Sequence, residues 1–387
     1  MTSTPQSARI PDLDGLRGFA ILSVVLMHFF YNPDPRLIGP VHAIQRTFAL
    51  EWTGVDLFFV LSGFLIGGIL MDHRDSPSYF KTFYLRRAFR IIPIYYLWIC
   101  LLILLIAVGG PLLRTHTNSG RLPPLNFDIY QHFLFSQNLW MVNYITLANS
   151  LLSPTWSLAV EEQFYLVAPL LIRYLRRGLI PGVLLAIIVL APILRLLIRL
   201  HSGVEPNWPA YQLMPCRADA LAIGMLVAYA WRTPTIRGKN ICPSELARSY
   251  FYGSAGRDDC DLVALPEYPN DAVTQTVGYS VVALFYASVL LITMGLRTGP
   301  IAKFMRWKLL QEFGRISCCL YLIHVAVGYF DARNHSLYGL AERSDWTTEY
   351  LDRLCACAII VELFRKSDAA ARHRFSMKQQ AWALFRN

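Results

Sequence analysis

Residues 54 to 71 read Gly54-Val-Asp-Leu-Phe-Phe-Val-Leu-Ser-Gly-Phe-Leu-Ile-Gly-Gly-Ile-Leu-Met71, an apolar run in which Asp56 is the single charge. A helix that crosses the hydrocarbon core of a bilayer needs about 20 mainly apolar residues. The whole chain has a matching composition, because 55% of its 387 residues are hydrophobic and 16% are charged. Soluble domains carry about 25% charged residues. The sequence therefore predicts an integral membrane protein and excludes a soluble globular domain.

Similar runs recur along the chain and predict an all-α, polytopic transmembrane helix bundle of about nine to ten spans. We expect a single membrane-embedded domain over residues 1–387. The eight clearest candidate spans are residues 16–31, 53–71, 91–108, 156–175, 179–200, 209–231, 277–296 and 313–330. A ninth, at 351–364, contains Asp352 and Arg353, so we expect a degenerate last span after residue 350.

Clusters of Lys and Arg predict the orientation, since such residues are concentrated in cytoplasmic connections. They crowd the connections before residues 91 and 179, which predicts a cytoplasmic N-terminus. We expect a multi-pass protein of the cell inner (plasma) membrane. Simple alternation would then put the basic segment 297–312 outside, so one crossing is missing. The polar stretch 232–276 lies where that crossing is needed. It is either a long cytoplasmic loop or an atypical replacement of a span.

The net charge of +10 does not indicate nucleic-acid binding, because the basic residues fall in short clusters between apolar runs. The eight cysteines are scattered without the two-residue spacing of zinc or redox motifs. We therefore expect no metal site and no resident cofactor.

The first expected helix, read from Asp12 to His28, contains the ionisable residues Asp12, Asp14, Arg17 and His28. Charged groups at membrane depth are unfavourable and usually functional. Arg17 and His28 share a helix face and are separated by roughly 16 Å along the axis. The pattern predicts that Arg17 binds a charged group near the cytoplasmic end and that His28 takes part in proton transfer deeper in the membrane. Alternatively, Arg17 reaches the lipid headgroups and His28 caps the outer end of the span.

The second span combines packing and polar residues. Gly63 and Gly67 are four residues apart, a spacing that lets helices approach closely. Asp56 and Ser62 have no such packing explanation, and Ser62 is a candidate for substrate binding.

Arg87 and Arg90 lie three residues apart at the cytoplasmic start of the third span. Two guanidinium groups on one helix face suit a phosphate or pyrophosphate, although a topological signal alone also explains a basic pair here. Glu161 in the fourth span shares a face with Ser157 and Tyr165. It is a candidate to orient or polarise an imidazole, or it is an interfacial ion-pair partner.

Four further polar residues lie in or at the start of the later spans, and the sequence leaves open whether each of them is structural or functional. They are Arg217, Asp219, Tyr321 and His324.

Together these motifs resemble the acyltransferase-3 family of membrane O-acyltransferases. In chain order they are Asp14-Gly-Leu-Arg17 followed by His28, Phe58-Phe-Val-Leu-Ser-Gly-Phe-Leu65, Arg87-x-x-Arg90, Trp156-Ser-Leu-Ala-Val-Glu161, Arg217-Ala-Asp219 and Tyr321-Leu-Ile-His324. The resemblance covers residues 10–231 and 277 to about 330. It departs from the family at 232–276 and in the last span.

The resemblance implies transfer of an acyl group, commonly acetyl from acetyl-CoA, to a hydroxyl of a cell-surface or exported carbohydrate. Carried over, it makes His28 the catalytic histidine, Arg17 its partner, Arg87 and Arg90 a second basic pair, and Glu161 the carboxylate of the fourth span. We expect Arg87 and Arg90 to hold the phosphates of acyl-CoA. The other substrate-binding candidates are Asp14, Ser62, Arg217, Asp219 and His324.

Two points stay open at this stage. The imidazole of His28 either takes the proton of the acceptor hydroxyl or accepts the acyl group itself. The alternative function is a multi-span transporter or flippase of a glycan precursor that consumes no acyl-CoA. A non-catalytic membrane scaffold leaves Arg17, His28 and Glu161 unexplained. A soluble hydrolase is disfavoured because no Gly-x-Ser-x-Gly elbow occurs.

Overall fold

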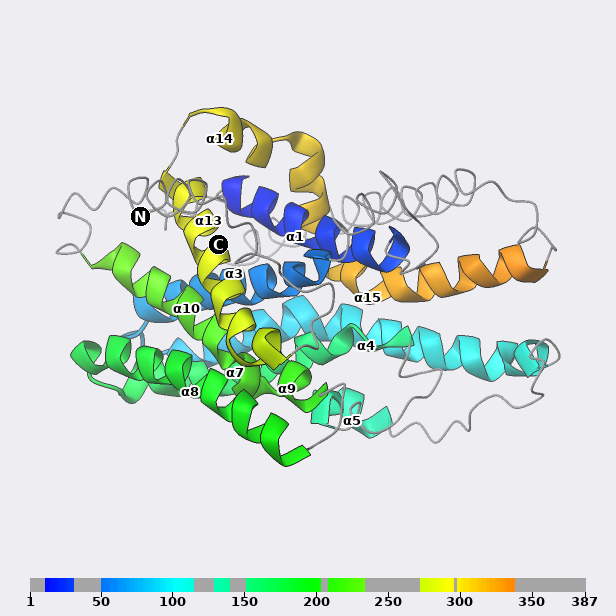
Figure 1. Ribbon diagram of the computed structural model, residues 1–387, viewed down its shortest axis with the longest axis horizontal. Coiled ribbons are helices and arrows are strands. Elements are labelled where there is room, and N and C mark those ends of the chain that lie inside the picture. Colours follow the sequence, from blue (N-terminus) through cyan, green and yellow to red (C-terminus); the bar gives the residue numbers. More distant parts are fainter. Residues whose placement is uncertain are drawn as a thin grey trace, which may run out of the picture.

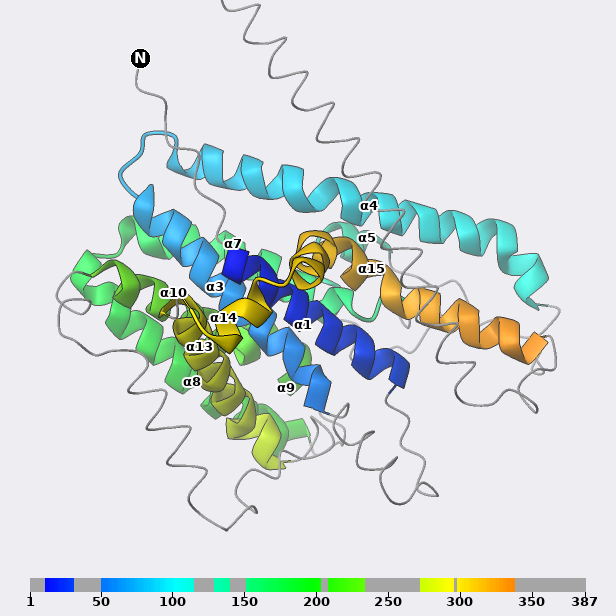
Figure 2. The ribbon, with the colours of Figure 1, turned by 90° about the horizontal axis from the view of Figure 1, so that it is seen from above.

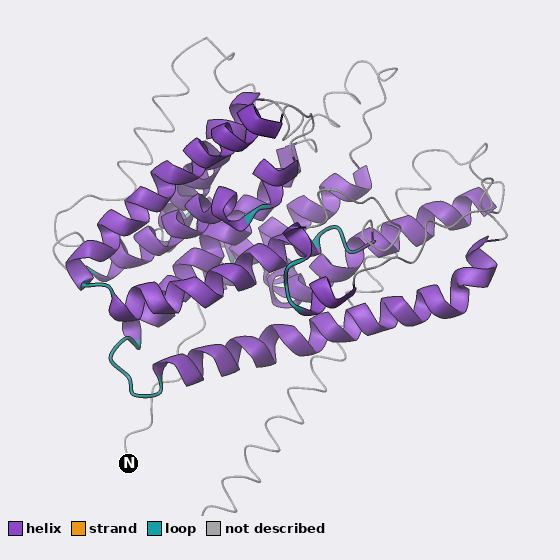
Figure 3. Ribbon diagram, turned by 90° about the horizontal axis from the view of Figure 1, so that it is seen from below, coloured by secondary structure: helices purple, strands orange, loops and turns teal. Residues whose placement is uncertain are grey.

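The computed structural model describes residues 11–30, 50–114, 129–139, 151–202, 208–233, 272–295 and 298–337. Within these ranges every regular element is a helix and none is a strand (Figure 3). The all-helical fold is therefore confirmed. The expected degenerate span at 351–364 and residues 234–271 of the polar stretch lie outside the described residues.

Eight long helices form the bundle shown in Figure 1. They are α1 (Pro11–Phe30), α3 (Gly54–Asp72), α4 (Tyr79–Arg114), α7 (Thr155–Tyr174), α8 (Ile180–Ser202), α10 (Met214–Arg232), α13 (Tyr279–Gly295) and α15 (Lys308–Leu337). The short elements between them are η1 (Leu50–Thr53), α5 (Ile129–Phe133), η2 (Gln137–Leu139), η3 (Arg177–Leu179), α9 (Trp208–Gln212), η5 (Thr274–Gly278) and α14 (Pro300–Met305). Each of the eight expected spans lies mostly in one long helix, but the span expected at 209–231 is divided between α9 and α10, with Leu213 outside both helices.

Five helical segments in the described part are long and apolar enough to cross a membrane. They are Gly54–Asp72, Tyr79–Leu105, Arg177–His201, Pro209–Arg232 and Thr274–Gly295. The helices α1, α7 and α15 are outside this set, and they carry Arg17, Glu161 and His324 respectively. The membrane character is thus supported, whereas a total of nine to ten spans remains a prediction.

The third span differs from the expectation in its length. Helix α4 begins at Tyr79, well before the expected residue 91. Its first turns contain basic residues, which end an apolar run but do not end a helix. Arg87 and Arg90 therefore lie inside a continuous helix, which Figure 2 shows along one side of the bundle.

Two helix pairs pack with backbones in direct contact. A Cβ atom on Gly63 of α3 would lie 2.0 Å from the carbonyl oxygen of Leu221 in α10, and one on Gly224 would lie 2.1 Å from that of Val60. The packing role predicted for Gly63 is confirmed. Helices α1 and α15 make the same kind of contact at Gly18 and Gly314.

Ion pairs mark one end of the bundle, which we call the basic end. Here Arg306 pairs with Asp12 at 2.7 Å, Arg232 with Asp72 at 2.7 Å, and Arg177 with Asp75 at 2.6 Å. The first pair joins the start of α1 to the α14–α15 connection, the second joins the ends of α3 and α10, and the third joins the α3–α4 connection to the α7–α8 connection.

The start of α13 lies at the opposite end of the bundle. Gln275 accepts a hydrogen bond of 2.9 Å from Arg199, which belongs to the last turns of α8. Helix α10 thus ends at the basic end, whereas α13 begins away from it. The crossing that the basic segment 297–312 requires stays a prediction.

We predict that Gly63→Ala destabilises the fold by about 1–3 kcal/mol, because the added methyl group overlaps the Leu221 carbonyl and the two helices must separate. The measurement is thermal unfolding of the purified protein in detergent. Gly182→Ala in α8 is the matched control, since no atom lies within 4 Å of its added Cβ. Equal melting temperatures of the two variants would contradict the prediction.

Candidate functional site

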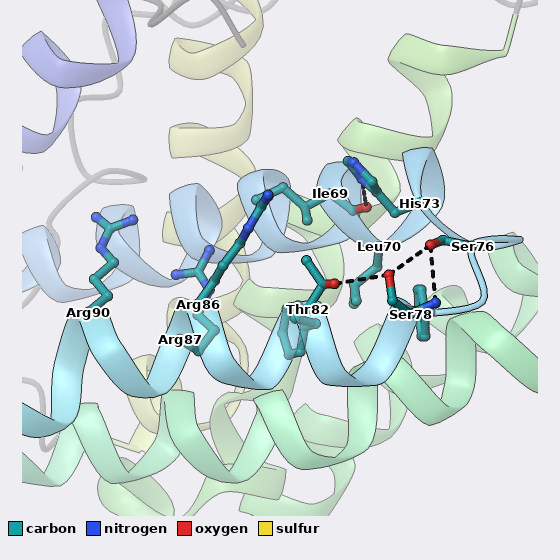
Figure 4. A pocket seen from close by; sticks show the side chains of 11 residues that line it. Ile69, Leu70, His73, Ser76, Ser78, Thr82, Arg86, Arg87 and Arg90 are labelled. Carbon is teal, nitrogen blue, oxygen red and sulfur yellow. Dashed lines mark hydrogen bonds between the residues drawn. The ribbon is translucent and has the colours of Figure 1, made fainter. Parts of the chain in front are cut away.

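Two cavities meet at Arg87 and Arg90 of α4, which line both of them. The outer cavity has a volume of about 410 Å³ and lies at the basic end, between the last turn of α3 and the first turns of α4. Figure 4 shows the guanidinium groups of Arg86, Arg87 and Arg90 on the same side of α4 as the end of α3. The outer cavity thus combines three arginines within one helix segment.

Hydroxyl groups line the other part of the outer cavity. Thr82 donates to the Ser78 hydroxyl at 3.1 Å, and the Ser76 and Ser78 hydroxyls are 3.3 Å apart (Figure 4). Guanidinium and hydroxyl donors together match the oxygen atoms of phosphate groups. The outer cavity therefore has the chemistry of a phosphate-binding site.

The inner cavity has a volume of about 110 Å³ and lies deeper in the bundle. Arg17 of α1, Ser62 of α3 and Glu161 of α7 line it together with Arg87 and Arg90. The structure thus brings together, from four different helices, five residues that the sequence analysis identified.

Glu161 is held by two hydroxyl groups within this cavity. It accepts a hydrogen bond of 3.0 Å from Ser62 and one of 2.5 Å from Tyr165. The guanidinium of Arg87 lies over the Tyr165 ring, with its Cζ 5.3 Å from the ring centroid. The sequence placed Tyr165 on the face of Glu161 but did not identify it as a ligand of that carboxylate.

Tyr321 connects the inner cavity with the two histidines. Its hydroxyl lies 2.6 Å from the Ser157 hydroxyl, and both residues line the cavity. Its ring is 5.7 Å from that of His324, which in turn is 4.8 Å from the ring of His28. Polar side chains therefore extend from the arginines of α4 to His28, the proposed catalytic group.

The two residues of the first motif take different positions. Arg17 faces the inner cavity, with a nitrogen 3.9 Å from a carboxylate oxygen of Asp14. Asp14 is buried beside the α1–α15 contact, where its carbonyl oxygen faces Gly314. Asp14 is thus placed to orient Arg17 rather than to line either cavity.

Arg217 and Asp219 form buried ion pairs outside the two cavities. Arg217 contacts Asp56 at 2.6 Å, and its Cζ lies 4.1 Å from the centroid of the Tyr279 ring. Asp219 pairs with Arg195 at 2.9 Å and accepts a hydrogen bond of 2.5 Å from Ser280. Their role in substrate binding stays a prediction, and their observed contacts join α3, α8, α10 and α13.

Sequence reasoning missed Arg195. The available signal was an arginine inside the apolar run of α8, a position that normally requires a buried partner. Among the described residues, no group of three or more His, Cys, Asp or Glu residues is arranged to hold a metal ion.

Comparison with known proteins identifies the family. The acyltransferase-3 family model, which is described as an acyltransferase domain, matches residues 10–331. The chain belongs to the acyltransferase-3 family. The matched range contains all six sequence motifs and both cavities. No solved structure matches the chain.

Curated relatives of this acyltransferase-3 protein include O-acetyltransferases. The O-acetyltransferase OatA of Staphylococcus aureus (strain NCTC 8325 / PS 47) is 26% identical over 326 residues, which are 83% of this chain and 51% of OatA. YrhL of Bacillus subtilis (strain 168), named as a candidate peptidoglycan O-acetyltransferase, is 27% identical over 338 residues, 82% of this chain and 48% of YrhL. The chain spans about half the length of these curated relatives.

We predict that Asp56→Ala destabilises the protein by about 3–5 kcal/mol, because it leaves the Arg217 guanidinium buried without its carboxylate. Thermal unfolding in detergent measures the loss. Asp72→Ala is the control, since its pair with Arg232 is exposed and contributes little. The prediction fails if Asp56→Ala melts at the temperature of the control.

Proposed function

We propose that this acyltransferase-3 protein transfers an acyl group, acetyl in the simplest case, from acyl-CoA to a hydroxyl of a cell-surface or exported carbohydrate. The observation that carries the proposal is the line of polar side chains from the arginine-lined cavities to His28. The family and the named O-acetyltransferase relatives support the reaction class.

The outer cavity is the proposed site of the donor's phosphates. Its three arginines supply positive charge and forked donors, and it lies at the basic end, which the positive-inside rule assigns to the cytoplasm. Acyl-CoA is available on that side. This assignment corresponds to a multi-pass protein of the inner (plasma) membrane with a cytoplasmic N-terminus.

The spacing of the arginines and the histidine supports a long donor molecule. Arg17 and His28 are separated by roughly 16 Å along α1, and Arg17 lines the same cavity as Arg87 and Arg90. Acyl-CoA carries its phosphates and its thioester at opposite ends of an extended arm. With the phosphates at the arginines, the arm follows the inner cavity and the thioester reaches toward His28.

His28 is the proposed general base. Its Nδ1 lies 2.8 Å from the carbonyl oxygen of Val24, and because a carbonyl can only accept, Nδ1 carries the proton. The other nitrogen, Nε2, then has a free lone pair. It takes the proton of the acceptor hydroxyl while the hydroxyl oxygen attacks the thioester carbon. The C–S bond breaks, and the departing thiolate receives the proton. The same Nε2 would carry the acyl group in a two-step route.

A transporter or flippase of a glycan precursor is the second candidate function. It predicts movement of the glycan without consumption of acyl-CoA, whereas acyl transfer releases one free CoA thiol for each ester formed. Thiol release measured with purified protein in liposomes distinguishes the two functions.

We predict that His28→Ala lowers acyl transfer by about a hundredfold or more, since it removes the proposed base. The assay follows labelled acetyl from acetyl-CoA into membrane glycans at equal amounts of inserted protein. His201→Ala, at the exposed end of α8, is the control and should retain full activity. Activity of His28→Ala within a few-fold of the parent would remove His28 from the mechanism.

We also predict that Arg87→Lys and Arg90→Lys each raise the KM for acetyl-CoA several-fold and leave the KM for the acceptor unchanged. Lysine keeps the charge that orients the membrane protein but loses the forked donors that bind phosphate oxygens. Steady-state kinetics with both substrates varied provide the measurement. Arg177→Lys, an exposed arginine at the same end, is the matched control. An unchanged KM for acetyl-CoA in both variants would show that these arginines serve only to orient the protein in the membrane.

A further inference from the structure

His324 of α15 is a buried histidine whose second nitrogen is free. Its side chain is 1% exposed, and its Nδ1 lies 2.8 Å from the carbonyl oxygen of Tyr321. Since the carbonyl only accepts, Nδ1 carries the proton and Nε2 has the lone pair. This Nε2 is buried and has no hydrogen-bond partner among the described residues. A buried acceptor without a donor is unfavourable and needs an explanation.

The ring of His324 is in contact with the ring of the other histidine, His28. The bond to Tyr321 fixes the Nδ1 edge of the His324 ring against its own helix, so the Nε2 edge points away from α15. The ring of His28 on α1 lies across from it, with centroids 4.8 Å apart and ring planes at 82°. His28 itself is exposed, whereas His324 is not, so an acceptor substrate reaches His28 first.

Both histidines make the same kind of hydrogen bond through Nδ1, so neither ring carries a proton on Nε2. Each donates its Nδ1 proton to a backbone carbonyl of its own helix, and each has a lone pair on Nε2. A single added proton on Nε2 of His28 would give the pair one donor and one acceptor. In contrast, the hydrogen bonds recorded for Glu161 come from Ser62 and Tyr165, so that carboxylate is engaged on the other side of the cavity.

We propose that His324 is the positioning residue of His28 and accepts a hydrogen bond from the imidazolium that forms during acyl transfer. This inference rests on the proposed function. When the acceptor hydroxyl is deprotonated, its proton moves to Nε2 of His28, and the oxygen forms the ester bond as the C–S bond breaks. The N–H of His28 donates to Nε2 of His324 until the proton passes to the CoA thiolate. The products are the ester and free CoA thiol, and His324 is unchanged.

Two substitutions of His324 separate this role from packing. In His324→Gln the side-chain amide reaches the position of Nε2 and its oxygen preserves an acceptor there. In His324→Asn the shorter amide preserves the Nδ1 donor to the Tyr321 carbonyl and loses the acceptor toward His28. The proposal predicts that His324→Asn lowers kcat by about ten- to a hundredfold, the range for losing a hydrogen bond to a charged group, with both KM values unchanged. His324→Gln should stay within a few-fold of the parent.

The experiment measures label transfer and thiol release for the parent, both variants and His324→Phe, per molecule of monodisperse protein, together with their melting temperatures. Retained activity in His324→Asn, or equal losses in the Gln and Asn variants, overturns the proposal. If the melting temperature falls to the same extent in all three variants, and the activity does too, the proposal is also overturned and His324 is a packing residue. A parent that releases no thiol from acetyl-CoA refutes the proposed function instead, so the two failures are distinguishable.

Discussion

The carbonyl oxygen of Leu310 occupies the space in front of Gly18, where a Cβ atom would lie 1.8 Å from it. Gly314 on the facing helix is equally close to the Asp14 carbonyl, at 1.9 Å. Such contacts bring α1 and α15 closer than side chains would allow, and they fix the register of the two helices. The ring contact between His28 and His324 depends on that register, because sliding by one helical turn of 5.4 Å would separate the rings. The site is therefore built on backbone contact as much as on its polar side chains.

Buried charge holds the other half of the bundle together. Arg217 with Asp56 and Arg195 with Asp219 connect helices that are apolar elsewhere. Breaking such a pair leaves one charge without a partner in a medium that cannot solvate it, so each pair strongly disfavours separation of its helices. Helix α3 belongs to both halves, because it carries Asp56 and also lines the inner cavity together with α1, α4, α7 and α15.

The sequence predicted the long helices well because a membrane span requires a long apolar run, although the run at 209–231 is divided between α9 and α10. It also identified five residues of the inner cavity, since ionisable groups in apolar runs are few. It did not predict which charges pair. Asp56 and Arg217 are 161 positions apart, and only the close packing of α3 on α10 brings them together. The start of α4 was misplaced for a different reason, because hydropathy reports the lipid boundary and not the end of a helix.

The arrangement of the proposed groups along the membrane normal carries a consequence for how donor and acceptor meet. The arginines lie toward the basic end, and His28 lies near the last turn of α1, toward the opposite end. Under the proposed function, a donor held at its phosphates would enter from the basic end, and the acceptor would approach the exposed His28 near the other end of α1. The two substrates would then meet at His28 from opposite ends of the bundle. In the proposed reaction His28 carries the proton as an imidazolium until the thiolate leaves, and a neutral His324 beside it can accept a hydrogen bond without bringing a second charge to membrane depth.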